Sequence, residues 1–177
     1  DTPNPIRICV DLLEEEINGL AGLGARKWAD QRGHLNAPVV GRQPEGQIGD
    51  TVGVIARDSE GLLAAATSTG GCSHRPPGRV GDVPLPGSGF WVEGSVAVAA
   101  TGIGEAITCA LLSNKVYERI IASKEDSIES LSRAMNWGIE SLIAPTHQVG
   151  LIALGSDGEG RGESNTDMPW ATWCADL

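Results

Sequence analysis

The sequence lacks several features that mark particular classes of protein. No run of about 18 or more apolar residues occurs, so a transmembrane helix is not expected. The cysteines form no Cys-x-x-Cys pair and no Cys/His cluster that would bind zinc, so no metal site is expected. We expect buried free thiols rather than a disulfide framework at Cys9, Cys72, Cys109 and Cys174. The sequence also shows no basic-then-apolar signal peptide, which favours a cytoplasmic location.

Basic residues are scarce as well. Lysine and arginine number 13 against 23 aspartates and glutamates, which gives a formal net charge of −10. Nucleic acids and anionic membranes bind basic surfaces, because the protein must displace counterions. We therefore expect neither as a partner, and we expect a solvated acidic surface. The 177 residues, 41% of them hydrophobic, suffice for one globular domain with a substantial core.

The spacing of apolar residues predicts the order of helices and strands. Residues 6–32 have apolar side chains at three- and four-residue steps, interrupted by glycines, which predicts two helices and a turn. Residues 34–49 are rich in glycine and proline and predict an exposed, protease-accessible linker. The runs 51–56 and 62–67, separated by a turn at 58–61, predict a β-hairpin.

The second half of the chain predicts further strands and helices. We expect a loop over 72–89, an extended run over 91–100, a helix that includes Ile107 and Leu111, a second helix over 127–143, a strand over 150–154, and a final strand in the tail from Asn165. Strands segregated from helices in this way favour a layered α+β fold over alternating βαβ units.

Thr51 stands where a cut after Asp50 would make it an N-terminus. A threonine hydroxyl is a poor nucleophile until a base takes its proton, and an N-terminal threonine can use its own α-amino group. A free α-amine has a pKa of about 7.7–8.0, so much of it is neutral near physiological pH. In an uncut chain Thr51 has only an amide nitrogen, which cannot be that base. An isolated Asp-Thr-Val-Gly is more often the start of a strand. The neighbouring motifs must therefore decide whether Thr51 is a nucleophile.

Five motifs occur in a fixed order along the chain. They are Asp50-Thr51-Val52-Gly53, Thr67-Ser68-Thr69-Gly70-Gly71, Pro77-Gly78-Arg79-Val80-Gly81-Asp82, Thr101-Gly102-Ile103-Gly104-Glu105 and Asn165-Thr166. In this order they resemble the asparaginase type 2 family of N-terminal-nucleophile hydrolases. That family includes plant-type asparaginases, isoaspartyl peptidases, glycosylasparaginases and threonine aspartase. The resemblance runs from about Leu12 to Met168.

The resemblance implies a catalytic group of four residues. Thr51 is the nucleophile, and the hydroxyl of Thr69 helps to orient it. Thr101 and Gly102 are the oxyanion-hole donors, through a hydroxyl and a backbone N–H. The reaction is the amidohydrolysis of asparagine or an isoaspartyl peptide through an acyl-enzyme, without a cofactor.

The resemblance also implies a group that binds the head of the substrate. Arg79 binds the α-carboxylate, a task that suits a planar bidentate guanidinium. Asp82 holds the α-ammonium, and the backbone carbonyl of Gly104 assists it. An acid at Asp82 is useful only when the substrate carries a free α-ammonium.

The fold that the resemblance implies is a four-layer αββα sandwich. A cut between Asp50 and Thr51 makes α and β subunits that stay together. Residues 1–50 are then the C-terminal part of the α-subunit region with its linker, residues 51–177 are the β-subunit region, and together they form one domain. Because 50 residues precede Thr51 and family α subunits are much longer, we expect an N-terminally truncated sandwich. The resemblance further implies a homodimer of αβ units.

Other functions stay open on the sequence alone. A threonine-aspartase-like endopeptidase is favoured by Asp50 before the nucleophile, but Asp82 and Thr69 argue against it. Glycosylasparaginase shares the aspartate before the nucleophile, and Gly71 weighs slightly against it. An inactive, truncated relative that serves as a binding or structural protein is the alternative from a different class.

Overall fold

The computed structural model describes residues 2–37, 51–72, 74–76, 78–125 and 127–175. The chain divides into two compact units, residues 1–47 and 48–177. The smaller unit contains the two helices that the apolar spacing predicts, α1 (Pro5–Leu12) and α2 (Gly22–Gln31). Most of the expected linker and the expected cut after Asp50 lie outside the described residues.

Polar contacts hold the smaller unit together. His34 Nε2 lies 2.7 Å from a carboxylate oxygen of Asp11, and Arg32 forms an ion pair with Glu15. The Arg32 guanidinium also lies 3.6 Å from the centre of the Trp28 ring. Within α1 and α2 only Ala29 is buried. With one buried residue in its two helices, this unit has little core of its own. Its exposed ion pairs add little stability, because each contributes only about 0–1 kcal/mol.

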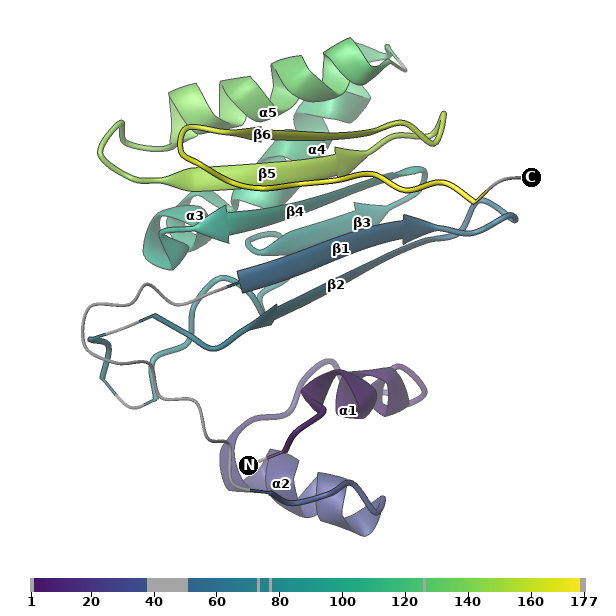
Figure 1. Ribbon diagram of the computed structural model, residues 1–177, viewed down its shortest axis with the longest axis vertical. Coiled ribbons are helices and arrows are strands. Elements are labelled where there is room, and N and C mark those ends of the chain that lie inside the picture. Colours follow the sequence, from purple (N-terminus) through teal and green to yellow (C-terminus); the bar gives the residue numbers. More distant parts are fainter. Residues whose placement is uncertain (1, 38–50, 73, 77, 126, 176–177) are drawn as a thin grey trace. The chain divides into compact units, whose positions relative to one another are not determined.

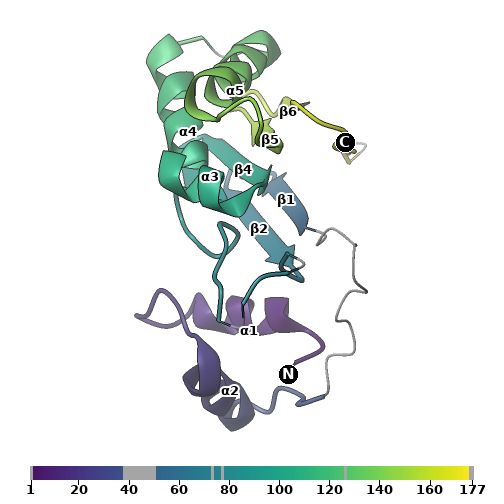
Figure 2. The same cartoon turned by 90° about the vertical axis from the view of Figure 1, so that its left-hand side faces the viewer.

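The larger unit is built in layers, with helices on one face of a sheet and a hairpin on the other (Figures 1 and 2). Its elements are β1 (Thr51–Arg57), β2 (Leu63–Thr69), β3 (Phe90–Glu93), β4 (Val96–Gly102), α3 (Gly104–Ala110), α4 (Leu112–Ser123), α5 (Ile128–Leu142), β5 (Val149–Leu154) and β6 (Gly160–Ser164). The main sheet is antiparallel in the order β3-β4-β5-β6, and β1 pairs with β2 in a separate hairpin. The α+β class predicted from the sequence is confirmed.

Strand β4 lies between the two other layers. Val96, Val98 and Ala100 join the core that the helices cover, together with alternate residues of β5. Ala99 points the other way, because a Cβ placed on Gly53 of β1 would lie 3.8 Å from the Ala99 Cβ. A strand covered on both faces has a nearly continuous apolar sequence, which explains the run of valines and alanines here.

The hairpin of β1 and β2 depends on the turn between its strands. Asp58 Oδ1 accepts the backbone N–H groups of Glu60 and Leu62, each at 2.9 Å. Gly61 has a φ of +86°, which glycine adopts without steric cost. The turn sets the register in which Thr51 lies opposite Thr69, and it confirms the predicted hairpin.

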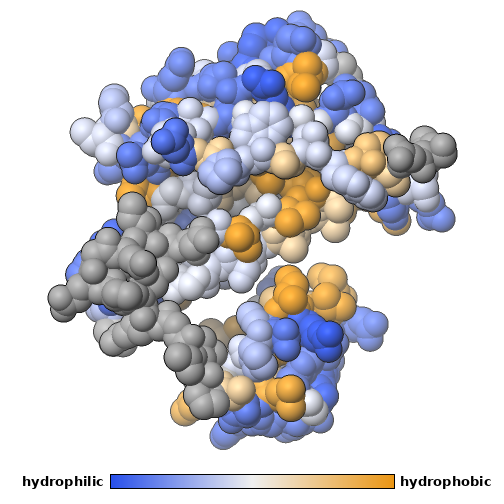
Figure 3. All heavy atoms as spheres, viewed as in Figure 1, coloured by the Kyte–Doolittle hydropathy of each residue, from blue (hydrophilic) through white to orange (hydrophobic). Residues whose placement is uncertain are grey.

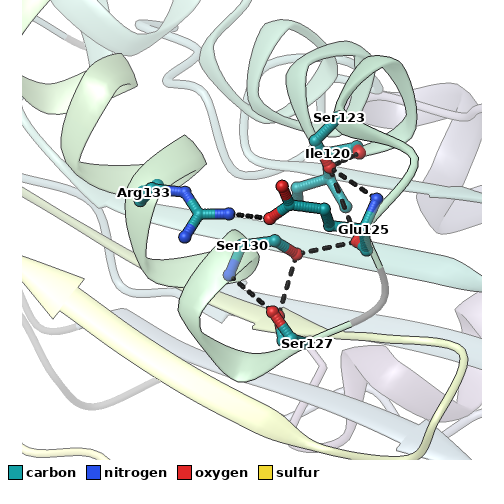
Figure 4. A network of polar contacts seen from close by, with 6 residues as sticks. All are labelled: Ile120, Ser123, Glu125, Ser127, Ser130 and Arg133. Carbon is teal, nitrogen blue, oxygen red and sulfur yellow. Dashed lines mark hydrogen bonds and ion pairs between the residues drawn. The ribbon is translucent and has the colours of Figure 1, made fainter.

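The connection between α4 and α5 is held by a local polar network (Figure 4). Ser127 is the N-cap of α5, and its hydroxyl accepts the backbone N–H of Ser130 at 3.2 Å. The Ser130 hydroxyl donates to the carbonyl of Glu125 at 2.9 Å, and the Glu125 carboxylate pairs with Arg133. The Ser123 hydroxyl donates back to a carbonyl in the last turn of α4 at 2.7 Å. N-caps of this kind stabilise a helix by about 1 kcal/mol.

Two segments are divided where the sequence predicted one element. The extended run expected over 91–100 is a hairpin of β3 and β4, because Gly94 turns the chain with a φ of +56°. The helix expected after Gly104 is broken at Leu111, whose φ is +51°, into α3 and α4. The break has a tertiary cause: the first N–H groups of α4, at Ser113 and Asn114, donate to carbonyls of the 82–89 loop.

The predicted strand after Asn165 is wrong. The last strand is β6, and residues 165–175 form none. The Asn165 side chain takes over backbone bonding, since its Oδ1 accepts the Val149 N–H at 2.8 Å. Beyond it Trp170 packs over β6, where a Cβ on Gly162 would lie 2.6 Å from the indole ring.

The four cysteines are free, as predicted, but all are exposed rather than buried. None belongs to the set of buried residues packed between the helices and the main sheet. Among the helices described, none is long and apolar enough to cross a membrane.

Candidate active site

The hairpin brings two threonine hydroxyls together. Thr51 begins β1 and lies opposite Thr69, which ends β2. The Thr51 hydroxyl donates to Thr69 Oγ1 at 3.0 Å, and the same oxygen accepts the Gly71 N–H at 3.0 Å. Gly71 has a φ of +86°, so the chain turns there and its N–H points back at the threonine. The second hydroxyl therefore holds the first in a fixed orientation.

A pocket of about 210 Å³ borders Thr51, the first residue of this pair. Its lining includes Thr51 and also Thr101, which lies near the end of β4 opposite Gly150. Gly102 follows with a φ of +131°, and a Cβ there would lie 2.2 Å from the Gln148 carbonyl oxygen. Only glycine fits this approach of β4 to the chain entering β5.

The C-terminal segment forms another wall of the pocket. Residues 168–171 line it, and Met168 packs so closely that a Cβ on Gly150 would lie 2.2 Å from its sulfur. This wall was not predicted: a strand was expected in the tail, and no pattern in the sequence indicates that residues 168–171 line a pocket. The pocket lining does not include Thr69, Arg79 or Asp82.

Arg79 is held by a carboxylate of the next motif. Its Nε lies 3.1 Å from Glu105 Oε1, and its Nη2 lies 3.0 Å from Oε2, a bidentate pair. Arg75 lies 3.5 Å from the same carboxylate. The Arg79 side chain is 14% exposed and the Glu105 side chain 51% exposed, so water reaches the carboxylate of the pair more than the guanidinium. Glu105 belongs to a motif that the sequence singled out, but its pairing with Arg79 was not predicted.

Asp82 is a buried carboxylate with an unsatisfied oxygen. Its residue exposure is 5%, and among the described residues Oδ2 has no hydrogen-bond partner. A buried acceptor without a partner costs about 1–3 kcal/mol, so it is uncommon without a functional reason. A Cβ on Gly104 would lie 2.6 Å from both Asp82 Oδ1 and Arg79 Nη2. The absence of a side chain at Gly104 lets both charged groups approach the backbone.

The charged groups have shifted pKa values with distinct causes. Burial raises the pKa of Asp82, and the nearby Arg79 only partly opposes this. The hydrogen bond from Arg79 lowers the pKa of Glu105 to about 2. The same hydrogen bond raises the pKa of Arg79. The site therefore keeps the Arg79 pair ionised at neutral pH and contains an acid that is destabilised when charged.

The described residues of the predicted site fall into two groups. Thr51 contacts Thr69 and shares the pocket with Thr101. Arg79 and Asp82 converge on Gly104, two positions after Gly102. Asp50 lies outside the described residues, so the cleavage site has no structural description.

These features define an α+β protein with a pocket lined by one of two hydrogen-bonded threonines, and with a shielded arginine and a buried acid on a neighbouring loop. A comparison with models of protein families shows to which family such a protein belongs. The sequence model described as asparaginase matches residues 23–176, and the chain belongs to this family.

Several curated proteins are similar to the chain. It is 50% identical over 101 residues to the plant-type L-asparaginase of Pyrobaculum calidifontis, covering 53% of this chain and 34% of that protein. It is 38% identical over 169 residues to the isoaspartyl peptidase of Escherichia coli, covering 94% of this chain and 50% of that protein. It is 38% identical over 124 residues to the isoaspartyl peptidase/L-asparaginase of Bos taurus, covering 68% and 39%. The chain thus spans half the length of these relatives or less.

Proposed function

We propose that the chain carries the catalytic part of an N-terminal threonine amidohydrolase that hydrolyses L-asparagine, β-aspartyl peptides or both. The observation that carries the proposal is the 3.0 Å hydrogen bond from Thr51 to Thr69 at the edge of a pocket shared with Thr101. In this proposal the bond after Asp50 is cut, and the new α-amine of Thr51 takes the proton of its own hydroxyl.

The hydroxyl oxygen of Thr51 then attacks the side-chain carbonyl of the substrate. The Thr101 hydroxyl and the Gly102 N–H stabilise the negative charge that develops on the carbonyl oxygen, and losing one such donor costs about 3–4 kcal/mol. Ammonia or the remaining peptide leaves with the proton. Water then hydrolyses the aspartyl ester on Thr51 and releases aspartate. No cofactor takes part in these steps.

The head-group residues favour an amino-acid substrate. An α-ammonium gives the unpartnered Asp82 Oδ2 a charged hydrogen-bond donor. The guanidinium of Arg79 has five N–H donors. Glu105 accepts one from Nε and one from Nη2, and the α-carboxylate binds among the three that remain. A polypeptide cut after an internal aspartate has no free α-ammonium at that residue. Asp82 therefore favours asparagine and β-aspartyl peptides over an endopeptidase substrate.

The proposal extends to the rest of the fold. The outer face of the β1–β2 hairpin is apolar and exposed, with Val52 and Val54 each 61% exposed, and Figure 3 shows apolar surface in orange along β1. An α-subunit region would cover this face as the fourth layer of an αββα sandwich. In that arrangement residues 1–50 are the last part of the α-subunit region, residues 51–177 form the β subunit, both belong to one domain, and two αβ units form a homodimer.

The test is hydrolysis by purified protein. We expect aspartate release from L-asparagine or from a β-aspartyl dipeptide, and we expect Thr51→Ala to abolish it. Thr51→Ser retains a hydroxyl and should retain measurable turnover, while Thr172→Ala, at an exposed threonine of the tail, should match wild type. Turnover that survives Thr51→Ala would show that another residue is the nucleophile.

A further inference from the structure

Thr67 connects the strand that ends at Thr69 with the loop that carries the buried acid. Thr67 is on β2 two residues before Thr69, so both side chains point to the same face of the hairpin. In the register of the hairpin Thr67 lies opposite Gly53, and a Cβ on that glycine would lie 3.8 Å from the Thr67 methyl group. The Thr67 hydroxyl is therefore on the face that packs against β4, next to the pair that includes the proposed nucleophile.

The same hydroxyl reaches the loop that carries Asp82. Thr67 Oγ1 donates to the Val83 carbonyl at 2.9 Å. Val83 is 7% exposed and directly follows Asp82 in the chain. The Asp82 carbonyl accepts the backbone N–H groups of Leu85 at 2.9 Å and Gly89 at 3.1 Å. The loop around the acid is thus closed on itself, and Thr67 bonds it to the strand that ends at Thr69.

The proposed substrate requires a particular distance between the Asp82 carboxylate and the Thr51 hydroxyl. In asparagine and in β-aspartyl peptides, one methylene separates the α-carbon from the carbonyl carbon that is attacked. The acid that binds the α-ammonium and the hydroxyl that attacks the carbonyl must therefore lie at one matching separation. A misplacement of about 1 Å can cost about 100-fold in rate.

We infer that Thr67 is a positioning residue that fixes the Asp82 loop at the distance from Thr51 that an α-amino substrate requires. This inference rests on the proposed function. It assigns Thr67 no contact with substrate. The side chain acts through Asp82, so its loss should affect substrates with an α-ammonium more than analogues without one.

The experiment compares L-asparagine with succinamate, which keeps the carboxylate and the amide but lacks the α-ammonium. Thr67→Val removes the hydroxyl at nearly constant shape, and we expect kcat/KM for L-asparagine to fall about 10-fold, as for the loss of one partly buried hydrogen bond. The value for succinamate should change less than 3-fold by the same reasoning. Thr67→Ser should restore the wild-type ratio. Ser123→Ala, which removes a 2.7 Å hydroxyl-to-carbonyl bond at the end of α4, is the matched control and should leave the ratio unchanged.

A double-mutant cycle tests whether the effect passes through Asp82. In an Asp82→Asn background, Thr67→Val should leave the asparagine-to-succinamate ratio unchanged, because coupled residues are not additive. Equal losses on both substrates, an additive effect in the double variant, or failure of Thr67→Ser to restore the ratio would overturn the inference. If Thr67→Val does not melt cooperatively, Thr67→Ala removes the same hydroxyl and is judged by the same ratio.

Binding separates this inference from the proposed function. L-Aspartate and succinate differ only in the α-ammonium, and titration calorimetry measures both without any turnover. If wild type hydrolyses neither L-asparagine nor a β-aspartyl dipeptide, the proposed function fails. The inference about Thr67 is then decided by binding: selective weakening of L-aspartate in Thr67→Val supports it, and equal or absent weakening overturns it.

Discussion

Replacing Asp82 by asparagine removes a buried charge and keeps the shape of the side chain. Asp82 is 5% exposed, and in the proposed complex its charge pairs with the α-ammonium of the substrate. Removing one partner of a buried, hydrogen-bonded charge pair costs about 2–5 kcal/mol. Since about 1.4 kcal/mol is a factor of ten, kcat/KM for L-asparagine should fall by about 30- to 4,000-fold.

Without substrate, Asp82→Asn should leave the stability of the folded protein unchanged or raise it. Burial raises the pKa of Asp82, so the folded state binds its proton more tightly than the unfolded state. This acid therefore favours the folded state least when it is ionised, above its folded pKa, and stability recovers as the pH falls below that value. At pH 7 the uncharged Asp82→Asn variant should melt at or above the temperature of wild type. L-Aspartate should raise the melting temperature of wild type more than that of the variant.

The assay is release of ammonia from L-asparagine and from succinamate by the two proteins. Succinamate has no α-ammonium, so its kcat/KM should change little or rise in Asp82→Asn. A variant that loses the same factor on both substrates would refute the pairing of Asp82 with the ammonium. A melting temperature well below wild type would refute the account of the unpartnered oxygen.

Two further predictions concern ionised glutamates. Glu105 has its pKa lowered to about 2 by its arginine partner, so their ion pair stabilises the fold above about pH 4.5 and is lost as the pH falls toward 2. Melting temperatures of wild type should fall more steeply over this range than those of Glu105→Gln, and parallel curves would contradict the pairing. Burial alone would raise the pKa of Glu163, but hydrogen bonds from Ser132 at 2.7 Å and Arg161 at 2.9 Å outweigh it and lower the pKa. Glu163→Gln should lower the free energy of unfolding, measured in urea, by about 1.5–3 kcal/mol. Glu140→Gln, at an exposed glutamate, should leave it unchanged. Equal free energies of unfolding for the two variants would show that the hydrogen bonds to Glu163 do not stabilise the fold.

Local chemistry made the first hairpin predictable. Two strand-forming runs flank a turn that contains Asp58 and Gly61, and both residues act in the turn through the bonds and the positive φ that their types favour. The contact between Thr51 and Thr69 needed the register as well. A slip of one residue would place the two hydroxyls on opposite faces, and periodicity alone does not exclude it.

Long-range contacts set the features that the sequence did not reveal. The break at Leu111 follows from carbonyls of the 82–89 loop that bond the first N–H groups of α4. Glu105 and Arg79 are 26 residues apart, so no local pattern indicates that they pair. The tail avoids strand structure because Asn165 and Trp170 pack their side chains on β5 and β6.

The central claim is that Thr51 attacks the substrate as a free N-terminus. The most direct test is mass spectrometry of the purified protein, quenched by acid during turnover of a β-aspartyl dipeptide and then mapped by proteolysis. The account predicts a fragment that begins at Thr51 and carries an aspartyl ester on that residue. Turnover by a chain that remains uncut between Asp50 and Thr51, or an ester on any other residue, would contradict it.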